Sequence, residues 1–317
     1  CMGFDARLLY EVAYHYYELG KTQEEIAGAL GVSRSQVSRA IKQAREEGIV
    51  VIKLVPPTTD FCDIQDELCR RFGLRQCVVV SGEAGPSRLL TQNLGMAGAR
   101  YLSGNLKPGS ALGISWGATL CELAAALTAE KPSLRDIVAV PLLGGLGQAS
   151  ADLQVNDIAA RVGAAFEGSN VFLHAPSIVD TPAARDTIMS DSNIRKVVDQ
   201  WARLDAAAVG VGSFVPPSTL LEEGGFSAED LDSLRDAGVV GDMCMSFFNI
   251  EGEHVSTPLE ARMIGVSLAE LRSVECVVAI AGGVNKASAI LGALRTGVVD
   301  VLVTDDVAAR KVLEMER

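Results

Sequence analysis

The chain has 317 residues, 48% of them hydrophobic, and a formal net charge of −12 at neutral pH. No apolar run is long enough to span a bilayer, and no charged-then-apolar signal segment opens the chain, so we expect a cytoplasmic protein with no membrane partner. Its seven cysteines are scattered without a C-x-x-C pair, and its three histidines lie far apart. These spacings argue against a disulfide framework and against a metal site.

The negative charge is unevenly distributed. Residues 1–57 carry seven basic and seven acidic side chains, so all of the net charge of −12 lies in residues 58–317. Within residues 33–53, five basic and two acidic side chains give a local charge of +3. A neutral head with this basic segment, on an acidic body, favours specific nucleic-acid binding by the head alone. Because one such head makes few phosphate contacts, we expect a homo-oligomer.

Residues 5–19 predict an amphipathic helix, and residues 22–49 predict two short helices joined by a turn at Gly31. Thr22 with Glu25, and Ser33 with Gln36, have the spacing of capping boxes, which would start the two helices. Apolar residues at helical spacing give the pair a common buried face. The arrangement predicts a three-helix head containing a helix-turn-helix.

The second helix of this pair carries polar and basic side chains on its outer face, the types that contact bases and phosphates in the major groove of double-stranded DNA. A solvated polar face is the structural alternative, and a protein-interaction module is another functional one. The candidate DNA-binding residues are Thr22, Gln23, Ser33, Arg34, Ser35, Gln36, Ser38, Arg39 and Lys42.

Residues 48–55 predict a short β-ribbon or wing, and Pro56-Pro57 interrupts it. We therefore place a domain boundary there, with a DNA-binding domain over residues 1–56 and a second domain over residues 57–317. A linking amphipathic helix is predicted over residues 60–73.

After residue 75 the pattern changes to β-rich runs that alternate with helices, which indicates an α/β domain with a mainly parallel sheet covered on both faces. The expected strands are 76–81, 111–115, 136–141, 170–176, 206–212, 239–249, 276–282 and 299–304. The expected helices are 88–104, 117–129, 154–167, 182–204, 227–236, 285–296 and 305–315.

Three strand ends in this domain have the chemistry of a ligand site, because ligands bind where the strands of such sheets end. They are the loops around Ser115–Thr119 and Gly144–Gln148, and the turn Gly282–Lys286; Gly210–Ser213 is a weaker fourth. Glycines there allow close backbone approach, and helix N-termini suit a phosphate, although a tight turn explains each loop taken singly. The candidate ligand-binding residues are Ser115, Trp116, Gly117, Ala118, Thr119, Gly144, Gly145, Leu146, Gln148, Asp242, Gly283 and Lys286.

Several of these residues have structural alternatives. Asp242 could hold sugar hydroxyls or cap a turn, and Trp116 could stack on a sugar ring or belong to the core. His174 could face the pocket but also suits a structural role. Asn156 could orient the loop at 144–148 or touch a ligand.

The segments TQEEIAGALGVSRSQVSRAIKQAREEGIV, GISWGATL, VPLLGG, VVGDMCMSFFN, AGGVNKASAILGAL and VLVTDDVA resemble, in order and spacing, those of the SorC family of bacterial transcriptional regulators. The resemblance implies a winged helix-turn-helix head and a Rossmann-like effector domain related in fold to sugar-phosphate isomerases. It also implies a homo-oligomer, commonly a tetramer, that regulates sugar catabolism and binds a sugar, sugar phosphate or polyol.

Some relatives carry a basic residue just before the paired glycines, where this chain has Leu142-Leu143. With Lys286 as the obvious cation of the candidate loops, we expect a monophosphate or a neutral sugar or polyol. An enzyme, such as a sugar-phosphate isomerase or deaminase using Asp242 and His174, is the alternative. No pair of titratable groups stands at a recognisable catalytic spacing, so we expect no catalytic residues and no cofactor.

Overall fold

The computed structural model describes residues 4–50, 61–82, 87–147, 153–214 and 226–316. The chain divides into two compact units, Cys1–Thr58 and Thr59–Arg317, and each is considered by itself. Residues 51–57, which hold most of the predicted wing and the predicted domain boundary, lie outside the described residues. Of that wing, only the turn at 48–50 is described.

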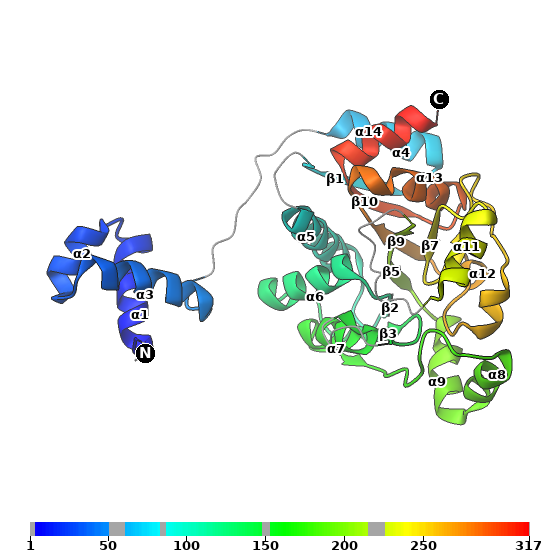
Figure 1. Cartoon of the computed structure of the whole chain (residues 1–317), viewed down its shortest axis with the longest axis horizontal. Coiled ribbons are helices and arrows are strands. Elements are labelled where there is room, and N and C mark those ends of the chain that lie inside the picture. The colour runs from blue at the N-terminus through cyan, green and yellow to red at the C-terminus, as the bar shows by residue number, and fades with distance from the viewer. Residues whose placement is uncertain (1–3, 51–60, 83–86, 148–152, 215–225, 317) are drawn as a thin grey trace. The chain divides into compact units, whose positions relative to one another are not determined.

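The first unit is a small helical domain (Figure 1) made of α1 (Ala6–Ala13), the π-helical η1 (Tyr14–Glu18), α2 (Gln23–Leu30) and α3 (Arg34–Glu46). Its core joins one face of each α-helix, through Leu9, Val12, Ile26, Val37 and Ile41. The predicted three-helix arrangement is therefore confirmed.

Both predicted capping boxes are present. Thr22 Oγ1 accepts the Glu25 N–H (3.3 Å) and Ser33 Oγ accepts the Gln36 N–H (3.2 Å). The side chains of Glu25 and Gln36 in turn each accept the N–H of the capping residue at 2.8 Å. Gly31 ends α2 with a left-handed φ of 66°, a conformation that glycine adopts without steric cost.

The second unit is built on a seven-stranded parallel sheet in the order β1-β10-β9-β5-β2-β3-β4. Its strands are β1 (Gln76–Val80), β2 (Ala111–Ile114), β3 (Val138–Pro141), β4 (Ser169–Asn170), β5 (Ala206–Gly210), β9 (Cys276–Ile280) and β10 (Val301–Asp305). After β2, the chain adds β3 and then β4 toward one edge of the sheet. After β5, it adds β9 and then β10 toward the other edge. The direction of winding therefore reverses between the neighbouring strands β2 and β5.

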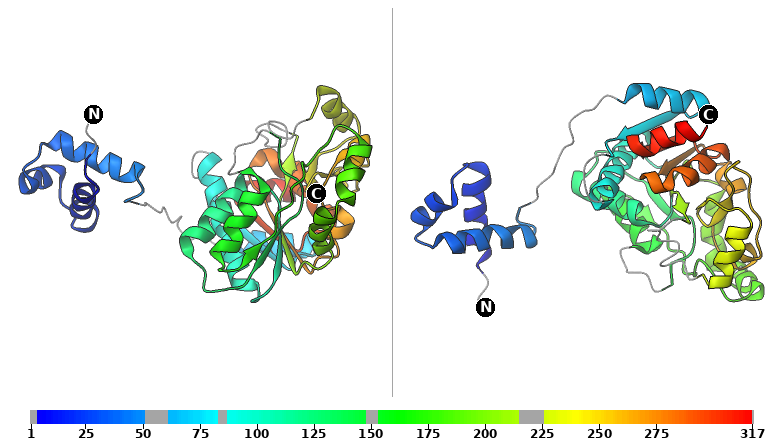
Figure 2. Two further views of the ribbon diagram at one scale, coloured as in Figure 1. Left: turned by 90° about the horizontal axis from the view of Figure 1, so that it is seen from below. Right: turned by 45° about the horizontal axis from the view of Figure 1, so that its top comes forward.

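Helices cover both faces of this sheet, as the α/β fold class requires (Figure 2). Three helices pack side by side on one face: α5 (Ser87–Asn105), α6 (Ala118–Glu130) and α7 (Val155–Ala165). The other face carries α13 (Ala287–Arg295) and α14 (Asp306–Met315), and α14 packs against α4 (Cys62–Phe72). The remaining helical elements are α8 (Pro182–Ser190), α9 (Ser192–Trp201), α11 (Ala228–Asp236), η3 (Pro258–Arg262), α12 (Leu268–Leu271) and η4 (Val284–Lys286).

One predicted strand is wrong. Residues 239–249 form a hairpin of β7 (Gly241–Met243) and β8 (Ser246–Phe248), which joins β6 (Gly212–Ser213) in a separate antiparallel sheet. Cys244 and Met245 turn the chain with φ of 53° and 64°. Positive φ at both central residues suits a tight hairpin, but neither residue type signals such a turn in the sequence.

Two other predicted elements are shorter than expected. The helix predicted over 182–204 is two helices, because the Asp191 side chain accepts the N–H groups of Asn193 and Ile194 and starts α9 afresh. The strand predicted over 170–176 keeps only Asn170 within β4. Beyond it, Asn156 takes the place of a neighbouring strand, accepting the Leu173 N–H (2.9 Å) and donating to the Leu173 carbonyl (3.0 Å).

Helices α5 and α6 approach closely through glycine. A Cβ built on Gly95 would lie 2.7 Å from the backbone carbon of Glu122 and the backbone nitrogen of Leu123. In the same helix, a Cβ on Gly104 would meet nothing within 4 Å. The two glycines therefore differ in packing but share one helix.

This contrast gives a matched test of the fold. Gly95→Ala should lower the free energy of unfolding by about 1–3 kcal/mol, because the added methyl group forces the helix backbones apart. Gly104→Ala should raise it by about 0.5–1 kcal/mol, because alanine restricts the unfolded chain. Denaturant unfolding of both variants measures the two effects. Equal changes in the two variants would contradict the packing described.

Candidate functional site

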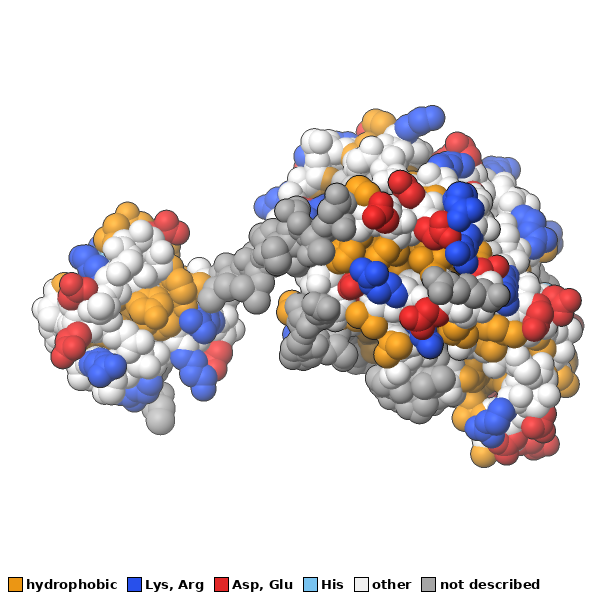
Figure 3. Space-filling model, turned by 90° about the horizontal axis from the view of Figure 1, so that it is seen from above, with side chains coloured by type: hydrophobic (Ala, Val, Ile, Leu, Met, Phe, Trp, Pro, Cys, Tyr) orange, Lys and Arg blue, Asp and Glu red, His pale blue; other side chains and the backbone are white. Residues whose placement is uncertain are grey.

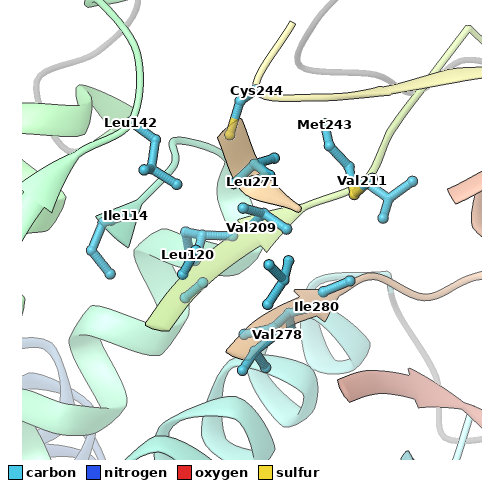
Figure 4. Close-up of a cluster of buried hydrophobic side chains, with 14 of the residues drawn as sticks. Ile114, Leu120, Leu142, Val209, Val211, Met243, Cys244, Leu271, Val278 and Ile280 are labelled. Carbon is cyan, nitrogen blue, oxygen red and sulfur yellow. The ribbon is translucent and has the colours of Figure 1, made fainter. Parts of the chain in front are cut away.

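A cavity of about 460 Å³ lies in the second unit where β2, β5 and β9 end. Its wall is formed by residues 115–120, 210–212 and 282–286, which follow these strands, together with Asp242 and Cys244 from the hairpin. The cavity occupies the point where the winding of the sheet reverses, since loops that leave β2 and β5 in opposite directions open a crevice between them. Figure 4 shows a cluster of buried hydrophobic side chains, and four of those that it labels, Leu120, Val211, Cys244 and Ile280, also line the cavity.

The loop Ser115–Thr119 lies in the wall along its whole length, as the sequence predicts for a ligand loop. Two hydrogen bonds tie Ser115 to β5: its N–H donates to the Ala208 carbonyl and its Oγ accepts the Gly210 N–H, each at 3.1 Å. Gly117, at a φ of 132°, then starts α6 without any side-chain cap. The first N–H groups of α6 therefore have no partner within the helix and can donate to a ligand.

Asp242, which is buried, and Lys286, which is half-buried, lie in the same wall, close enough for each charge to affect the pKa of the other. The Met245 N–H donates to Asp242 Oδ2 (2.9 Å), while Oδ1 has no partner in the described part of the chain. Burial raises the pKa of Asp242 to about 6. The hydrogen bond from the Met245 N–H and the charge of Lys286 act in the opposite direction and lower this pKa. Burial also lowers the pKa of Lys286, although Asp242 opposes that shift. Lys286 Nζ donates to the Val211 carbonyl at 2.8 Å.

Gly212 makes room for this carboxylate. A Cβ on Gly212 would lie 1.8 Å from Asp242 Oδ1, so no larger residue fits there. Gly212 and Asp242 are register partners of β6 and β7, which places the carboxylate directly over the glycine. The loop Gly210–Ser213, the weaker fourth candidate from the sequence, therefore contributes Gly210, Val211 and Gly212 to the cavity wall.

The glycine-rich segment after β3 is used differently. A Cβ on Gly144 would lie 2.2 Å from the Pro176 carbonyl oxygen, and the Gly145 N–H donates to the Ala175 carbonyl (2.8 Å). These glycines let two backbone segments pack together. Neither they nor the buried Leu146 line the cavity. From this segment, Leu143 is the residue that lines it. Gln148 lies outside the described residues.

Some wall residues were not found from the sequence. Leu90, Thr91 and Leu94 reach the cavity from α5, whose helical pattern carried no mark of a ligand. His174, in contrast, stacks on the exposed Phe172 (5.7 Å between ring centroids) and does not line the cavity. Trp116 does line it, and its buried Nε1 has no partner among the described residues.

In the first unit, α3 presents an exposed polar face. Arg34, Ser35, Ser38, Arg39 and Lys42 are all exposed on it. Lysine and arginine side chains are spread over the visible face of this unit, among acidic ones (Figure 3).

Three predicted DNA contacts also serve the fold of the head. Thr22 and Ser33 are helix caps, and the Gln36 side chain belongs to the second capping box, which leaves its Nε2 as the atom able to reach a base. Gln23, the first residue of α2, is half-buried.

Two further properties concern the described residues only. They include no cluster of three or more His, Cys, Asp or Glu side chains suited to a metal ion. They also include no helix with the length and apolar character needed to cross a membrane.

Two family models match the two units. The model described as "Putative sugar-binding domain" matches residues 57–314, and the "Homeodomain-like domain" matches residues 5–51. The match to residues 57–314 contains every described cavity residue, and the match to residues 5–51 contains α1 to α3.

Named relatives match over the whole chain. The sorbitol operon regulator of Klebsiella pneumoniae is 31% identical, over 98% of this chain and 98% of the regulator. The deoxyribonucleoside regulator of Bacillus subtilis is 29% identical, over 96% of each chain. The crystal structure of the full-length sorbitol operon regulator SorC from Klebsiella pneumoniae matches with a TM-score of 0.77 at 30% identity, over 98% of this chain and 100% of that one. With both units matched in one order, the chain belongs to the SorC family of bacterial transcriptional regulators.

Proposed function

We propose that the protein binds operator DNA through α3 and regulates genes of carbohydrate catabolism in response to a sugar, sugar phosphate or polyol. The observation that carries this proposal is the cavity at the reversal point of a sheet, whose wall holds Thr119, Asp242 and Lys286, in a chain that also holds a helix-turn-helix. Relatives named as sorbitol operon, erythritol catabolism and deoxyribonucleoside regulators support the ligand class.

The cavity offers two kinds of contact to such a ligand. The free N–H groups at the start of α6, with the Thr119 hydroxyl, suit a phosphate or a row of hydroxyls. Asp242 suits a hydroxyl donor when it is ionised. We therefore propose that the ligand contacts are Ser115–Thr119, Asp242, Gly283 and Lys286. To these we add residues 210–212, which also line the cavity.

The charge of the wall restricts the ligand further. Among the described wall residues Lys286 is the one cationic side chain, and it faces a buried carboxylate. Little positive charge is left to neutralise a bisphosphate, since Asp242 offsets it. A monophosphate or a neutral sugar or polyol fits this balance.

Oligomerisation follows from the head. Residues 1–57 are neutral overall, so one head makes few attractive phosphate contacts, and affinity grows when heads act together. We propose a cytoplasmic homo-oligomer, a tetramer, without a cofactor. Sedimentation with and without ligand measures the assembly.

We also propose that the protein is not an enzyme. His174 does not line the cavity that holds Asp242, so the acid and base suggested by the sequence are not brought together there. The Asp242–Lys286 pair is the one observation that favours catalysis, since two titratable groups with shifted pKa values share a cavity. Turnover of a panel of sugar phosphates would overturn our choice.

The DNA-binding role of α3 can be tested with matched arginine variants. Arg39→Ala should weaken binding to a duplex selected by the wild-type protein by about tenfold or more, because an exposed recognition-helix arginine contacts bases or phosphates. Ligand-induced thermal stabilisation should not change. Arg235→Ala removes the same charge from an exposed position on α11 and should leave DNA affinity unaltered. Gel-shift titration measures the DNA affinity of both variants. An equal loss of affinity in the two would argue against DNA recognition by α3.

The ligand-binding role of Asp242 can be tested by pH. Because its pKa is about 6, the folded protein gains a proton there as the pH falls from 7 to 5. A polyol without titratable groups, which donates to the ionised carboxylate, should therefore bind more weakly as the pH falls, approaching about tenfold per pH unit below the pKa. Calorimetric titration of a polyol found by thermal-shift screening measures the profile.

Two aspartate variants complete this test. Asp242→Asn cannot ionise, so it should bind the polyol weakly and almost independently of pH. Asp236→Asn, at an exposed position of α11, should keep the wild-type profile. If the polyol affinity of the wild-type protein does not change with pH, Asp242 is not a ligand contact.

A further inference from the structure

Asp305, the last residue of β10, is buried and holds three backbone groups at once. Its Oδ1 accepts the N–H groups of Val307 (3.1 Å) and Ala308 (3.0 Å), which starts α14. Its Oδ2 accepts the Gly283 N–H at 2.5 Å. One carboxylate thus caps a helix and also fixes the turn after β9.

Two glycines from neighbouring strand ends leave room for this carboxylate. A Cβ on Gly82, just after β1, would lie 2.5 Å from Asp305 Oδ1, and one on Gly282, after β9, would lie 2.4 Å from Oδ2. Neither glycine has a left-handed φ, so the backbone conformation does not require glycine at either position. Glycine is required at both positions because a side chain would enter the space that the Asp305 carboxylate occupies.

The turn that Asp305 fixes is part of the cavity wall. Gly283, at a φ of 93°, starts η4, and its carbonyl accepts the Lys286 N–H (2.9 Å). Residues 282–286 all line the cavity, whereas Asp305 does not. The bond from the Gly283 N–H to Asp305 therefore helps to place the turn that carries Lys286.

We propose that Asp305 is a positioning residue of the cavity, which holds the 282–286 wall in its binding geometry from behind and ties that wall to the start of α14. The link to ligand affinity rests on the function proposed above. The link to the geometry of the wall does not, and it can be measured without any ligand.

Asp305→Asn separates the two roles of the carboxylate. Asparagine is a good N-cap, so its oxygen can keep the two N–H bonds of α14, and its NH₂ group then faces the Gly283 N–H. Two donors cannot bond to each other, so the turn should loosen while the helix stays. In hydrogen-exchange measurements on the full chain, residues 282–286 should exchange about tenfold faster, and residues 306–315 should be unchanged.

The second readout is ligand affinity. A polyol or sugar phosphate that stabilises the wild-type protein should bind Asp305→Asn about tenfold more weakly, because the wall must be ordered again on binding. Should no compound bind the wild type, the proposed function fails, while the exchange result still decides the role of Asp305.

Gly82→Ala provides an independent variant, since its methyl group displaces the carboxylate from outside the cavity without touching the wall. It should reproduce the faster exchange of residues 282–286. Asp191→Asn is the matched control, because Asp191 caps α9 in the same way but is exposed and holds no cavity loop. The proposal is overturned if both test variants exchange like the wild type at 282–286, or if faster exchange is confined to residues 306–315.

Discussion

The reversal of strand order between β2 and β5 is the constraint on which the second unit depends. Parallel strands that carry helices on both faces leave a crevice only where neighbouring connections run in opposite directions. Here that reversal brings the ends of β2, β5 and β9 to one cavity, although they are separated by up to about 170 residues of chain. The hairpin β7–β8 then closes one side and brings Asp242 to the cavity.

Glycines set the detail of this site by leaving space for charged groups. Gly212 admits the Asp242 carboxylate, and Gly82 with Gly282 admits that of Asp305. Both carboxylates are buried, which is unfavourable unless N–H groups or cations face them. Asp305 has three N–H partners, whereas Asp242 has one N–H and Lys286. Asp242 Oδ1 is therefore left without a partner in the described part of the chain and can accept from a ligand, whereas both oxygens of Asp305 already accept backbone N–H groups.

The sequence predicts the helical head, the parallel sheet and two of the strand-end loops that line the cavity, because capping boxes and strand-glycine-helix patterns are local signals. It does not predict the hairpin over 239–249, whose turn depends on two non-glycine residues with positive φ. It also assigns Gly144 and Gly145 to a ligand loop, although their partner is the distant backbone of Ala175 and Pro176. A glycine that serves backbone packing and one that serves a ligand have the same local sequence pattern, so only the fold distinguishes them.

The position of Asp305 also gives a physical reason why occupancy of the cavity can reach other parts of the chain. The same carboxylate that fixes the wall starts α14, and α14 packs against α4, the first described helix after the head in sequence. A ligand that binds one geometry of the wall more tightly must favour the matching geometry of everything fixed to it. Under the function proposed above, the coupling is reciprocal: DNA changes the ligand affinity by the same factor by which the ligand changes the DNA affinity. In the homo-oligomer proposed above, even a small change of this kind would act on several neutral heads at once, whose joint binding to DNA exceeds that of one head.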